Sequence, residues 1–358
     1  MRTFGFRAFA VASAFIALIA ATISPAHAAY TIIDLGAGIT PNSINNVGQI
    51  AGYNGSGNLF LYDNGTVQEL GTFGGALTNV YGISINNNGL IAVTANSKKG
   101  YVYDSRTGNL LDMGFTGSSM NTFSINDSGQ VAGSYFNTQM RNFVYQNGVM
   151  TDIGNWGQAQ AYSYPVLNNT GKIAGTAANV YGDNAKSYIS DIDGKTAVSV
   201  LGDLGGSYSF VRGMNDFGDV VGQSSPISGS DHAFVYTAGS MKDLGSLGGL
   251  SIAYDINNQG QIIGFYEDAN KVRHSFIYEN GAMSDLTSLL TAGSGWDLSY
   301  AMALNDQGQI IGYGKLNGVT HGYLLSPVTA PVPIPAAAWL LGSGLLSLVG
   351  IRKKKSAL

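Results

Sequence analysis

Residues that can carry a positive charge recur at one position along the chain. Each stands two residues before a strand-like triplet that begins with an aromatic residue, as His232 stands before Phe234. The recurring residues are Lys99, Arg141, Lys186, His232, His274 and His321, and the corresponding residue nearest the N-terminus is Asn58. If these segments are structurally equivalent, the six side chains form a candidate ligand ring for an anionic sugar. Its charge would be highest below about pH 6.5, where histidine gains a proton.

The same recurrence allows a purely structural interpretation. Each of these side chains can end a strand and bond to a neighbouring turn or to a recurring aspartate such as Asp243. A zinc site built from the three histidines is disfavoured, because equivalent positions in adjacent repeats lie too far apart for bonds of about 2 Å. The sequence leaves the ligand ring and the structural role as alternatives, and it predicts no metal site.

Two tryptophans stand where the regular pattern is interrupted. Trp156 lies in a turn region, and Trp296 lies in an extra segment spanning residues 289–298. Exposed tryptophan on such loops can stack on sugar rings, but tryptophan also packs inside β-sheet proteins. Both residues are therefore candidate sugar-stacking residues, with packing as the equal alternative.

Known catalytic motifs are absent from the sequence. It contains no nucleophile elbow, zincin helix or phosphate-binding loop, and no cysteine. Its aspartates recur in equivalent places, for example Asp127, Asp216 and Asp306 after a turn asparagine. Recurrence predicts turn or strand-end hydrogen bonds, since a catalytic pair needs two unlike environments. A calcium site at residues 215–219 is a weaker alternative, because the segment lacks the regular calcium loop. We expect no catalytic residue and no cofactor.

A repeated phrase positions all of these residues. It reads Asn, two variable residues, Gly, a polar residue, Ile or Val, a small or apolar residue, and usually Gly, beginning with Asn45 to Gly52. Its anchoring glycines are Gly48, Gly89, Gly129, Gly171, Gly218, Gly260 and Gly308. Their spacing of roughly 40 to 48 residues is typical of a four-stranded propeller blade or a paired-helix repeat. Helical periodicity is absent, so the paired-helix alternative is excluded.

Each repeat contains four short strand-like segments. Asn-Gly pairs such as Asn64-Gly65 and Asn280-Gly281 predict tight two-residue turns between two of them. The apolar residues on both strand faces suit sheets stacked face to face. The last repeat lacks one strand, whereas residues 30–36 form an unpaired strand at the start of the body. We therefore predict an all-β, seven-bladed propeller in which the N-terminal strand closes the last blade and removes both open edges. An open superhelical array has the same local pattern and remains the alternative.

Both ends of the chain predict export. Residues 1–28 form a signal peptide, with Arg2 and Arg7, an apolar run and the small-x-small site Ala26-His27-Ala28. The propeller is expected at residues 29–326, followed by a linker, 327–335, that ends in the motif Val332, Pro333, Ile334 and Pro335. Residues 336–351 predict a transmembrane helix with a length of about 24 Å. Residues 352–358 predict a basic cytoplasmic tail.

This tail resembles the PEP-CTERM sorting signal of Gram-negative envelope proteins, in the form where Val-Pro-x-Pro replaces Pro-Glu-Pro. The resemblance implies recognition by an exosortase-type enzyme, removal of the helix and tail, and release or attachment among extracellular polysaccharide. A plain C-terminal anchor is the alternative. Residues 30–326 are similar to the extracellular HAF repeat family, through phrases such as His232-Ala233-Phe234. That family implies no particular activity.

Charge excludes one class of partner. The formal charge is −4; without Arg2 and Arg7 the counts are 16 basic and 22 acidic residues, or −6, and without Arg352 to Lys355 the charge is −10. Such a protein repels phosphate backbones, so nucleic acid is not an expected partner. The sequence predicts a secreted, non-enzymatic envelope or exopolysaccharide-associated protein, structural or carbohydrate-binding, with acidic polysaccharide as a candidate partner. A polysaccharide lyase or hydrolase and a protein-interaction scaffold are the alternatives.

Overall fold

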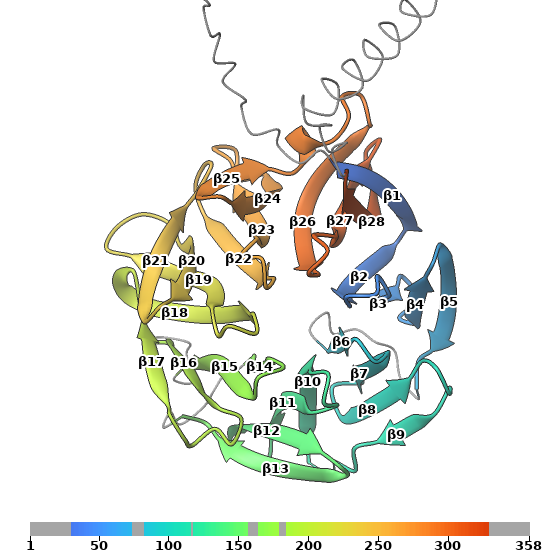
Figure 1. The fold of residues 1–358 in the computed structure, drawn as a ribbon, viewed down its shortest axis with the longest axis vertical. Helices are drawn as coiled ribbons and strands as arrows, with labels where there is room; N and C mark the ends of the chain where they lie inside the picture. The colour runs from blue at the N-terminus through green and yellow to red at the C-terminus, as the bar shows by residue number, and fades with distance from the viewer. Residues whose placement is uncertain (1–29, 74–81, 116, 157–163, 179–183, 329–358) are drawn as a thin grey trace, which may run out of the picture.

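The protein is a ring of seven four-stranded antiparallel sheets, which makes it a seven-bladed β-propeller (Figure 1). The computed structural model describes residues 30–73, 82–115, 117–156, 164–178 and 184–328. The fold class predicted from the repeat is confirmed. The predicted signal peptide, the sorting motif, the C-terminal helix and the basic tail lie outside the described residues.

The first four blades follow the chain from the channel outward. Blade one contains β2 (Ile39–Ile44), β3 (Ile50–Asn54), β4 (Leu59–Asp63) and β5 (Thr66–Gly71). Blade two contains β6 (Ile83–Ile85), β7 (Leu90–Ala95), β8 (Lys99–Asp104) and β9 (Leu110–Asp112). Blade three contains β10 (Ser119–Ile125), β11 (Val131–Phe136), β12 (Met140–Gln146) and β13 (Val149–Gly154). Blade four contains β14 (Val166–Leu167), β15 (Lys172–Ala177), β16 (Lys186–Asp191) and β17 (Ser199–Gly202).

The last three blades complete the ring. Blade five contains β18 (Gly205–Met214), β19 (Val220–Pro226), β20 (His232–Thr237) and β21 (Ser240–Gly245). Blade six contains β22 (Ser251–Ile256), β23 (Ile262–Glu267), β24 (Arg273–Glu279) and β25 (Ala282–Asp285), and the short 3₁₀-helix η1 (Thr287–Leu289) follows it. Blade seven contains β26 (Trp296–Leu304), β27 (Ile310–Leu316), β28 (Val319–Pro327) and, on its outer edge, β1 (Tyr30–Ala37).

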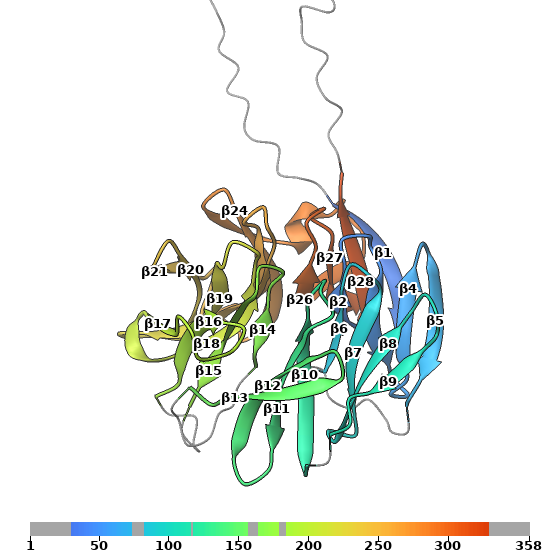
Figure 2. The ribbon, with the colours of Figure 1, turned by 60° about the horizontal axis from the view of Figure 1, so that its bottom comes forward.

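The N-terminal strand closes the ring, as the sequence predicted. β1 pairs with β28 in antiparallel register from Tyr30 opposite Pro327 to Ala37 opposite His321. Figures 1 and 2 both show β1 beside β28. The Asp34 carboxylate also lies 2.8 Å from Nδ1 of His321. Blade seven is therefore built from both ends of the body, and the ring has no open sheet edge at this joint.

Glycine and an aromatic residue recur together for a packing reason. A Cβ on Gly133 would lie 2.2 Å from the Asn121 carbonyl oxygen and 2.5 Å from the Phe143 ring. The corresponding aromatic residues, Phe60, Phe143, Phe234, Phe276 and Tyr323, are almost fully buried. The second strand of the blade must lack a side chain at this point so that the third-strand ring can lie beneath it. These buried rings anchor the apolar clusters that join neighbouring blades.

The predicted two-residue turns are present. Asn64-Gly65, Asn147-Gly148 and Asn280-Gly281 all have positive φ at both residues, which Asn and Gly tolerate best.

No helix among the described residues is long and apolar enough to cross a membrane.

Candidate functional site at the two ends of the central channel

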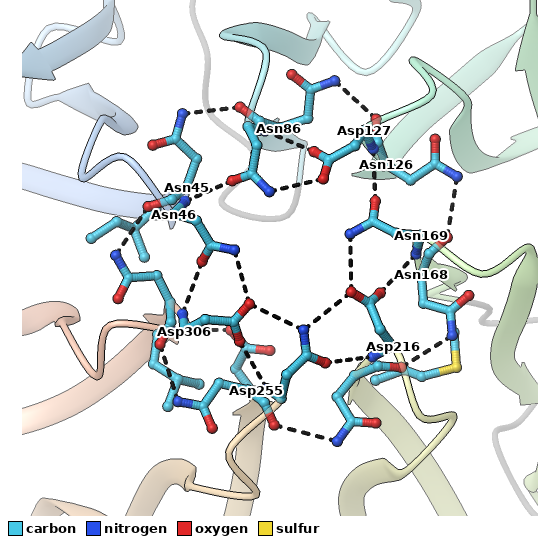
Figure 3. A pocket seen from close by; sticks show the side chains of 18 of the residues that line it. Asn45, Asn46, Asn86, Asn126, Asp127, Asn168, Asn169, Asp216, Asp255 and Asp306 are labelled. Carbon is cyan, nitrogen blue, oxygen red and sulfur yellow. Dashed lines mark hydrogen bonds between the residues drawn. The ribbon is translucent and has the colours of Figure 1, made fainter.

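A closed ring of asparagine side chains lies at one end of the central channel (Figure 3). In each blade an asparagine follows the innermost strand, and its Nδ2 donates to the backbone carbonyl oxygen of the equivalent asparagine in the next blade. The seven distances range from 2.9 to 3.3 Å, and Asn305 closes the circle by donating to Asn45. The ring members are Asn45, Asn86, Asn126, Asn168, Asn215, Asn257 and Asn305. Each blade is therefore tied to both neighbours at the same level.

The following residue in each blade forms a second closed ring. Each backbone N–H donates to the side-chain Oδ1 of its counterpart in the next blade, at 2.7 to 2.9 Å. The second-ring residues are Asn46, Asn87, Asp127, Asn169, Asp216, Asn258 and Asp306. We call the two rings, with the cavity of about 170 Å³ that they line, the Asn mouth.

The three carboxylates of the Asn mouth, Asp127, Asp216 and Asp306, accept hydrogen bonds at both oxygens. Asp216 Oδ2 accepts from Nδ2 of Asn169 at 3.2 Å and from Nδ2 of Asn258 at 3.1 Å. Asp306 Oδ2 accepts from Nδ2 of Asn46 and of Asn258 at 2.8 and 3.0 Å. Within the described ranges, no group of three His, Cys, Asp or Glu side chains is placed to hold a metal ion. The carboxylates of the Asn mouth therefore accept their hydrogen bonds from other residues of the Asn mouth. The hydrogen bonds expected from the recurrence are present, and many of them run between blades.

Asp255 is a buried carboxylate beside the Asn mouth. Its Oδ1 accepts from the Ile256 N–H at 2.9 Å, and its Oδ2 accepts from the Leu304 N–H of the next blade at 3.1 Å. Burial raises the pKa of Asp255 to about 7, although the two N–H donors act in the opposite direction. Gly213 of blade five leaves the necessary space, since a Cβ there would lie 3.1 Å from Asp255 Oδ1. Serine hydroxyls make the corresponding link in blades one to three, as Ser43 does to the Ile85 N–H.

The six residues of the candidate ligand ring lie near the start of the third strand in each blade. This position is at the opposite end of the strands from the Asn mouth, since β4 runs antiparallel to β3. Four of them contact an aspartate on, or directly after, the outermost strand: Arg141 with Asp152 at 2.5 Å, Lys186 with Asp203 at 2.7 Å, His232 with Asp243 at 2.9 Å, and His321 with Asp34 at 2.8 Å. In these blades the basic group has a carboxylate beside it.

The other two ring residues and Asn58 differ. His274 lies 3.6 Å from an Asp268 oxygen and 3.8 Å from an Asp297 oxygen. Lys99 is exposed, and in the described part of the chain it forms no ion pair. Asn58, at the same position in blade one, donates from Nδ2 to Glu69 at 3.3 Å. The structure thus places these residues at one level, in the outer half of the blades and away from the channel axis.

The two tryptophans lie against neighbouring aromatic residues. Trp296 is only 8% exposed, and its ring meets those of His321 and Tyr323 edge to face. Trp156 is half-buried and stacks on Tyr188 with ring centroids 6.1 Å apart. Trp296 therefore presents little ring surface on which a sugar could stack.

A second cavity lies further along the channel, and the sequence analysis missed it. It measures about 140 Å³ and is lined by Asn42, Ile83, Phe123, Tyr164, Val166, Arg212, Tyr254 and Met302, with at least one residue from every blade. Six of these stand three residues before an Asn-mouth asparagine, as Phe123 stands before Asn126. Three strand residues span about 10 Å. We call this site the aromatic cavity.

Arg212 is the single charged residue lining the aromatic cavity. Its guanidinium lies over the Tyr164 ring, 5.3 Å from the centroid, and its Nη2 donates to Gln223 Oε1 at 3.3 Å. Its Nε is buried and has no hydrogen-bond partner.

Comparisons with known proteins identify the fold alone. No protein-family profile and no curated protein sequence matches the chain. An oligogalacturonate lyase in complex with manganese is 12% identical, with a TM-score of 0.57, covering 84% of this chain and 99% of that one. The oligogalacturonate lyase of Vibrio parahaemolyticus is 10% identical, with a TM-score of 0.54 and coverages of 82% and 93%. A chain of the mitotic checkpoint complex is 12% identical, with a TM-score of 0.53 and coverages of 92% and 99%. Proteins with such different names share this architecture, so the residues of the channel must carry any functional argument.

Proposed function

We propose that this chain is an exported, non-enzymatic propeller that binds carbohydrate in its aromatic cavity. The observation that carries the proposal is the lining of that cavity, in which Phe123, Tyr164 and Tyr254 provide aromatic surface beside a few polar groups. A mostly apolar pocket with a small number of convergent polar groups is the usual form of a small-ligand site. Aromatic rings bind the apolar faces of sugars, and polar groups bind the hydroxyls.

The absence of catalysis is part of the proposal. The carboxylates nearest the axis, those of the Asn mouth and Asp255, accept hydrogen bonds from neighbouring blades, in arrangements that support the ring. General acid and base catalysis needs carboxyl groups that are free to exchange protons with a substrate. These groups instead hold fixed positions between blades.

The proposed setting follows from the ends of the chain. A signal peptide and a PEP-CTERM-type tail would deliver the propeller through an exosortase-type enzyme to the cell envelope or extracellular matrix, with transient anchoring in the inner membrane. Acidic polysaccharide is the proposed partner there. The candidate ligand ring stays a prediction. We place the binding site in the channel because four of the ring residues have a carboxylate within 3 Å.

A glycan array probed with the full-length chain tests the proposal. Phe123→Ala should weaken sugar binding about fivefold or more, because stacking of a nucleic-acid base on one aromatic ring is worth on the order of 1 to 3 kcal/mol and a sugar ring stacked on Phe123 should lose a comparable amount. Phe217→Ala is the matched control, since Phe217 is 76% exposed and lies at the Asn mouth. Equal loss in both variants, or no binding by the wild-type protein, would contradict carbohydrate binding in the cavity. Release of unsaturated or reducing ends from a bound polysaccharide would contradict the non-enzymatic role.

A further inference from the structure

We infer that the aromatic cavity takes a single sugar ring bearing a carboxylate, a uronic acid residue, and that Arg212 recognises the carboxylate. This inference rests on the proposed function and names its ligand class.

Arg212 has a donor that the protein leaves unused. Its Nε is shielded from solvent and has no acceptor. A buried donor without an acceptor costs roughly 1 to 3 kcal/mol, and more when the group is charged. Among the described ion pairs none includes Arg212. The protein therefore leaves the positive charge of Arg212 without a counter-ion, and an anionic group that enters the cavity lined by Arg212 would supply one.

The neighbours of Arg212 hold the guanidinium without neutralising it. Gln223 accepts from Arg212 Nη2 through Oε1, and its own Nε2 donates to Asp231 at 3.1 Å. Asp231 also accepts from the Tyr208 hydroxyl at 2.6 Å. Arg212 thus contacts the uncharged amide oxygen of Gln223. The carboxylate of this network, that of Asp231, bonds to Gln223 and not to Arg212. Tyr164, on which the guanidinium stacks, fixes the plane of the fork.

Fixed arginine forks favour carboxylates. The planar guanidinium presents two parallel N–H donors that match the two oxygens of a carboxylate, a geometry that lysine cannot reproduce. Cation–π contact with Tyr164 lowers the mobility of the group while leaving its charge intact. Arg212 is therefore suited to an anionic group that enters the channel.

The cavity limits the ligand to about one ring. Its volume of about 140 Å³ is close to that of an engineered cavity of about 150 Å³ that holds benzene. Phe123 meets Tyr164 edge to face, with ring centroids 5.1 Å apart, so the aromatic wall is continuous on the Arg212 side. One six-membered ring therefore fills the cavity, and the hydroxyl substituents of a sugar ring would extend from it into the channel.

The sequence pattern supports a specialised site. Six blades contribute unlike residues at one equivalent position: Asn42, Ile83, Phe123, Arg212, Tyr254 and Met302. The asparagine three residues further along is the same in all seven blades, whereas this position carries apolar, aromatic, amide and charged side chains. An asymmetric lining is what recognition of one asymmetric ligand requires.

Calorimetric titration of the full-length chain with sugar acids and their neutral counterparts tests this inference. The probes are glucuronic and galacturonic acid, their methyl esters, and glucose and galactose. We expect the wild-type protein to bind at least one acid tenfold or more tightly than its ester. Arg212→Gln should remove this preference, and Arg212→Lys should retain only part of it. Arg106→Gln is the control, because Arg106 is an exposed arginine on blade two, paired with Asp104.

The outcomes separate the two proposals. Equal affinity of the wild-type protein for an acid and its ester, or an unchanged preference in Arg212→Gln, overturns the inference and leaves carbohydrate binding intact. Absence of binding to every sugar on the glycan array overturns the proposed function as well. If Arg212→Gln does not fold, the Arg212 Nε–H resonance of the wild-type protein decides: it should shift with the acid and stay in place with the ester. A resonance that shifts with neither the acid nor the ester overturns the inference.

Discussion

The two ends of the central channel are built on opposite principles. At the Asn mouth, every blade contributes the same asparagine, and the side chains hydrogen-bond one another in closed circles. About 10 Å further along the same strands, the aromatic cavity has a different residue from nearly every blade and an arginine Nε without a partner. The hydrogen bonds of the Asn mouth hold the ring together, whereas the aromatic cavity presents groups that a ligand could bind. In a repeat protein, positions that repeat indicate architecture, and positions that vary indicate where function can be sought.

Removing the closing strand should have the largest effect, because both ends of the channel depend on a closed ring. Deletion of residues 30–37 removes β1 and exposes the β28 edge. We expect aggregation or a fall in melting temperature on the order of 10 °C or more, since an unpaired edge promotes association. Size-exclusion chromatography and thermal unfolding measure this. A monomer with unchanged melting would mean that β1 is not needed for closure.

Breaking the Asn mouth at one blade should have a medium effect on stability and little effect on ligand binding. Asn126 donates to the Asn168 carbonyl oxygen and accepts from the Gln130 N–H. Asn126→Ala leaves these buried groups without partners, so the free energy of unfolding should fall by about 1 to 3 kcal/mol. Denaturant unfolding measures the change.

The matched control for Asn126→Ala is Gln307→Ala, an exposed residue on the equivalent turn of blade seven. It should change stability by less than about 0.5 kcal/mol. If both variants lose the same stability, or if Asn126→Ala alone abolishes sugar binding in a folded protein, the proposed division between the two ends of the channel fails.

A pH dependence of stability should also appear. The pKa of Asp255 is about 7 in the folded protein and about 3.9 in an unfolded chain. Between these values the folded state binds more protons, so this group stabilises the fold fully below about pH 4 and loses that contribution as pH rises to 7. At about 1.4 kcal/mol per pH unit between these two values, the total is on the order of 4 kcal/mol. Most of it should appear as the difference in unfolding free energy between pH 4.5 and 7.5.

Asp255→Asn provides the comparison, because the amide has a similar shape and does not titrate in this range. Carboxylates with lowered pKa values, such as Asp152 and Asp203, change stability mainly below about pH 4, outside this window, and they do so equally in both proteins. The wild-type protein should therefore lose more stability toward pH 7.5 than the variant. Parallel pH profiles would contradict a buried Asp255 that titrates near neutrality.

Most of the fold could be predicted from the sequence, because the repeat determines it. The seven copies, the Asn-Gly turns and the unpaired strand at residues 30–36 predicted the blades and their closure, and the structure confirms them. The hydrogen bonds of the Asn mouth could not be assigned in advance. A turn asparagine is expected to bond within its own turn, as Asn45 does to Gln49, and only the closed ring brings it within reach of the next blade.

The aromatic cavity was missed for a different reason. Recurrence in the sequence indicates the candidate ligand ring from Lys99 to His321, because those residues occupy the same position in successive repeats. Arginine occupies this repeat position in blade five alone, and nothing in the local sequence of Arg212 distinguishes it from a surface arginine. Its role depends on the inward direction of its side chain and on Tyr164 of the neighbouring blade, contacts that only the assembled ring creates.

The pairing of β1 with β28 also determines the order in which this protein can fold. Blades one to six are each formed from consecutive strands, so their contacts are local in sequence and can form early. Thr31 must instead wait for Ser326, 295 residues later, before its strand has a partner. Contacts between distant residues are the slow steps of folding. During synthesis β1 is the first strand of the body to be made and the last to be paired, so ring closure is the step that a chaperone or a low temperature would influence most.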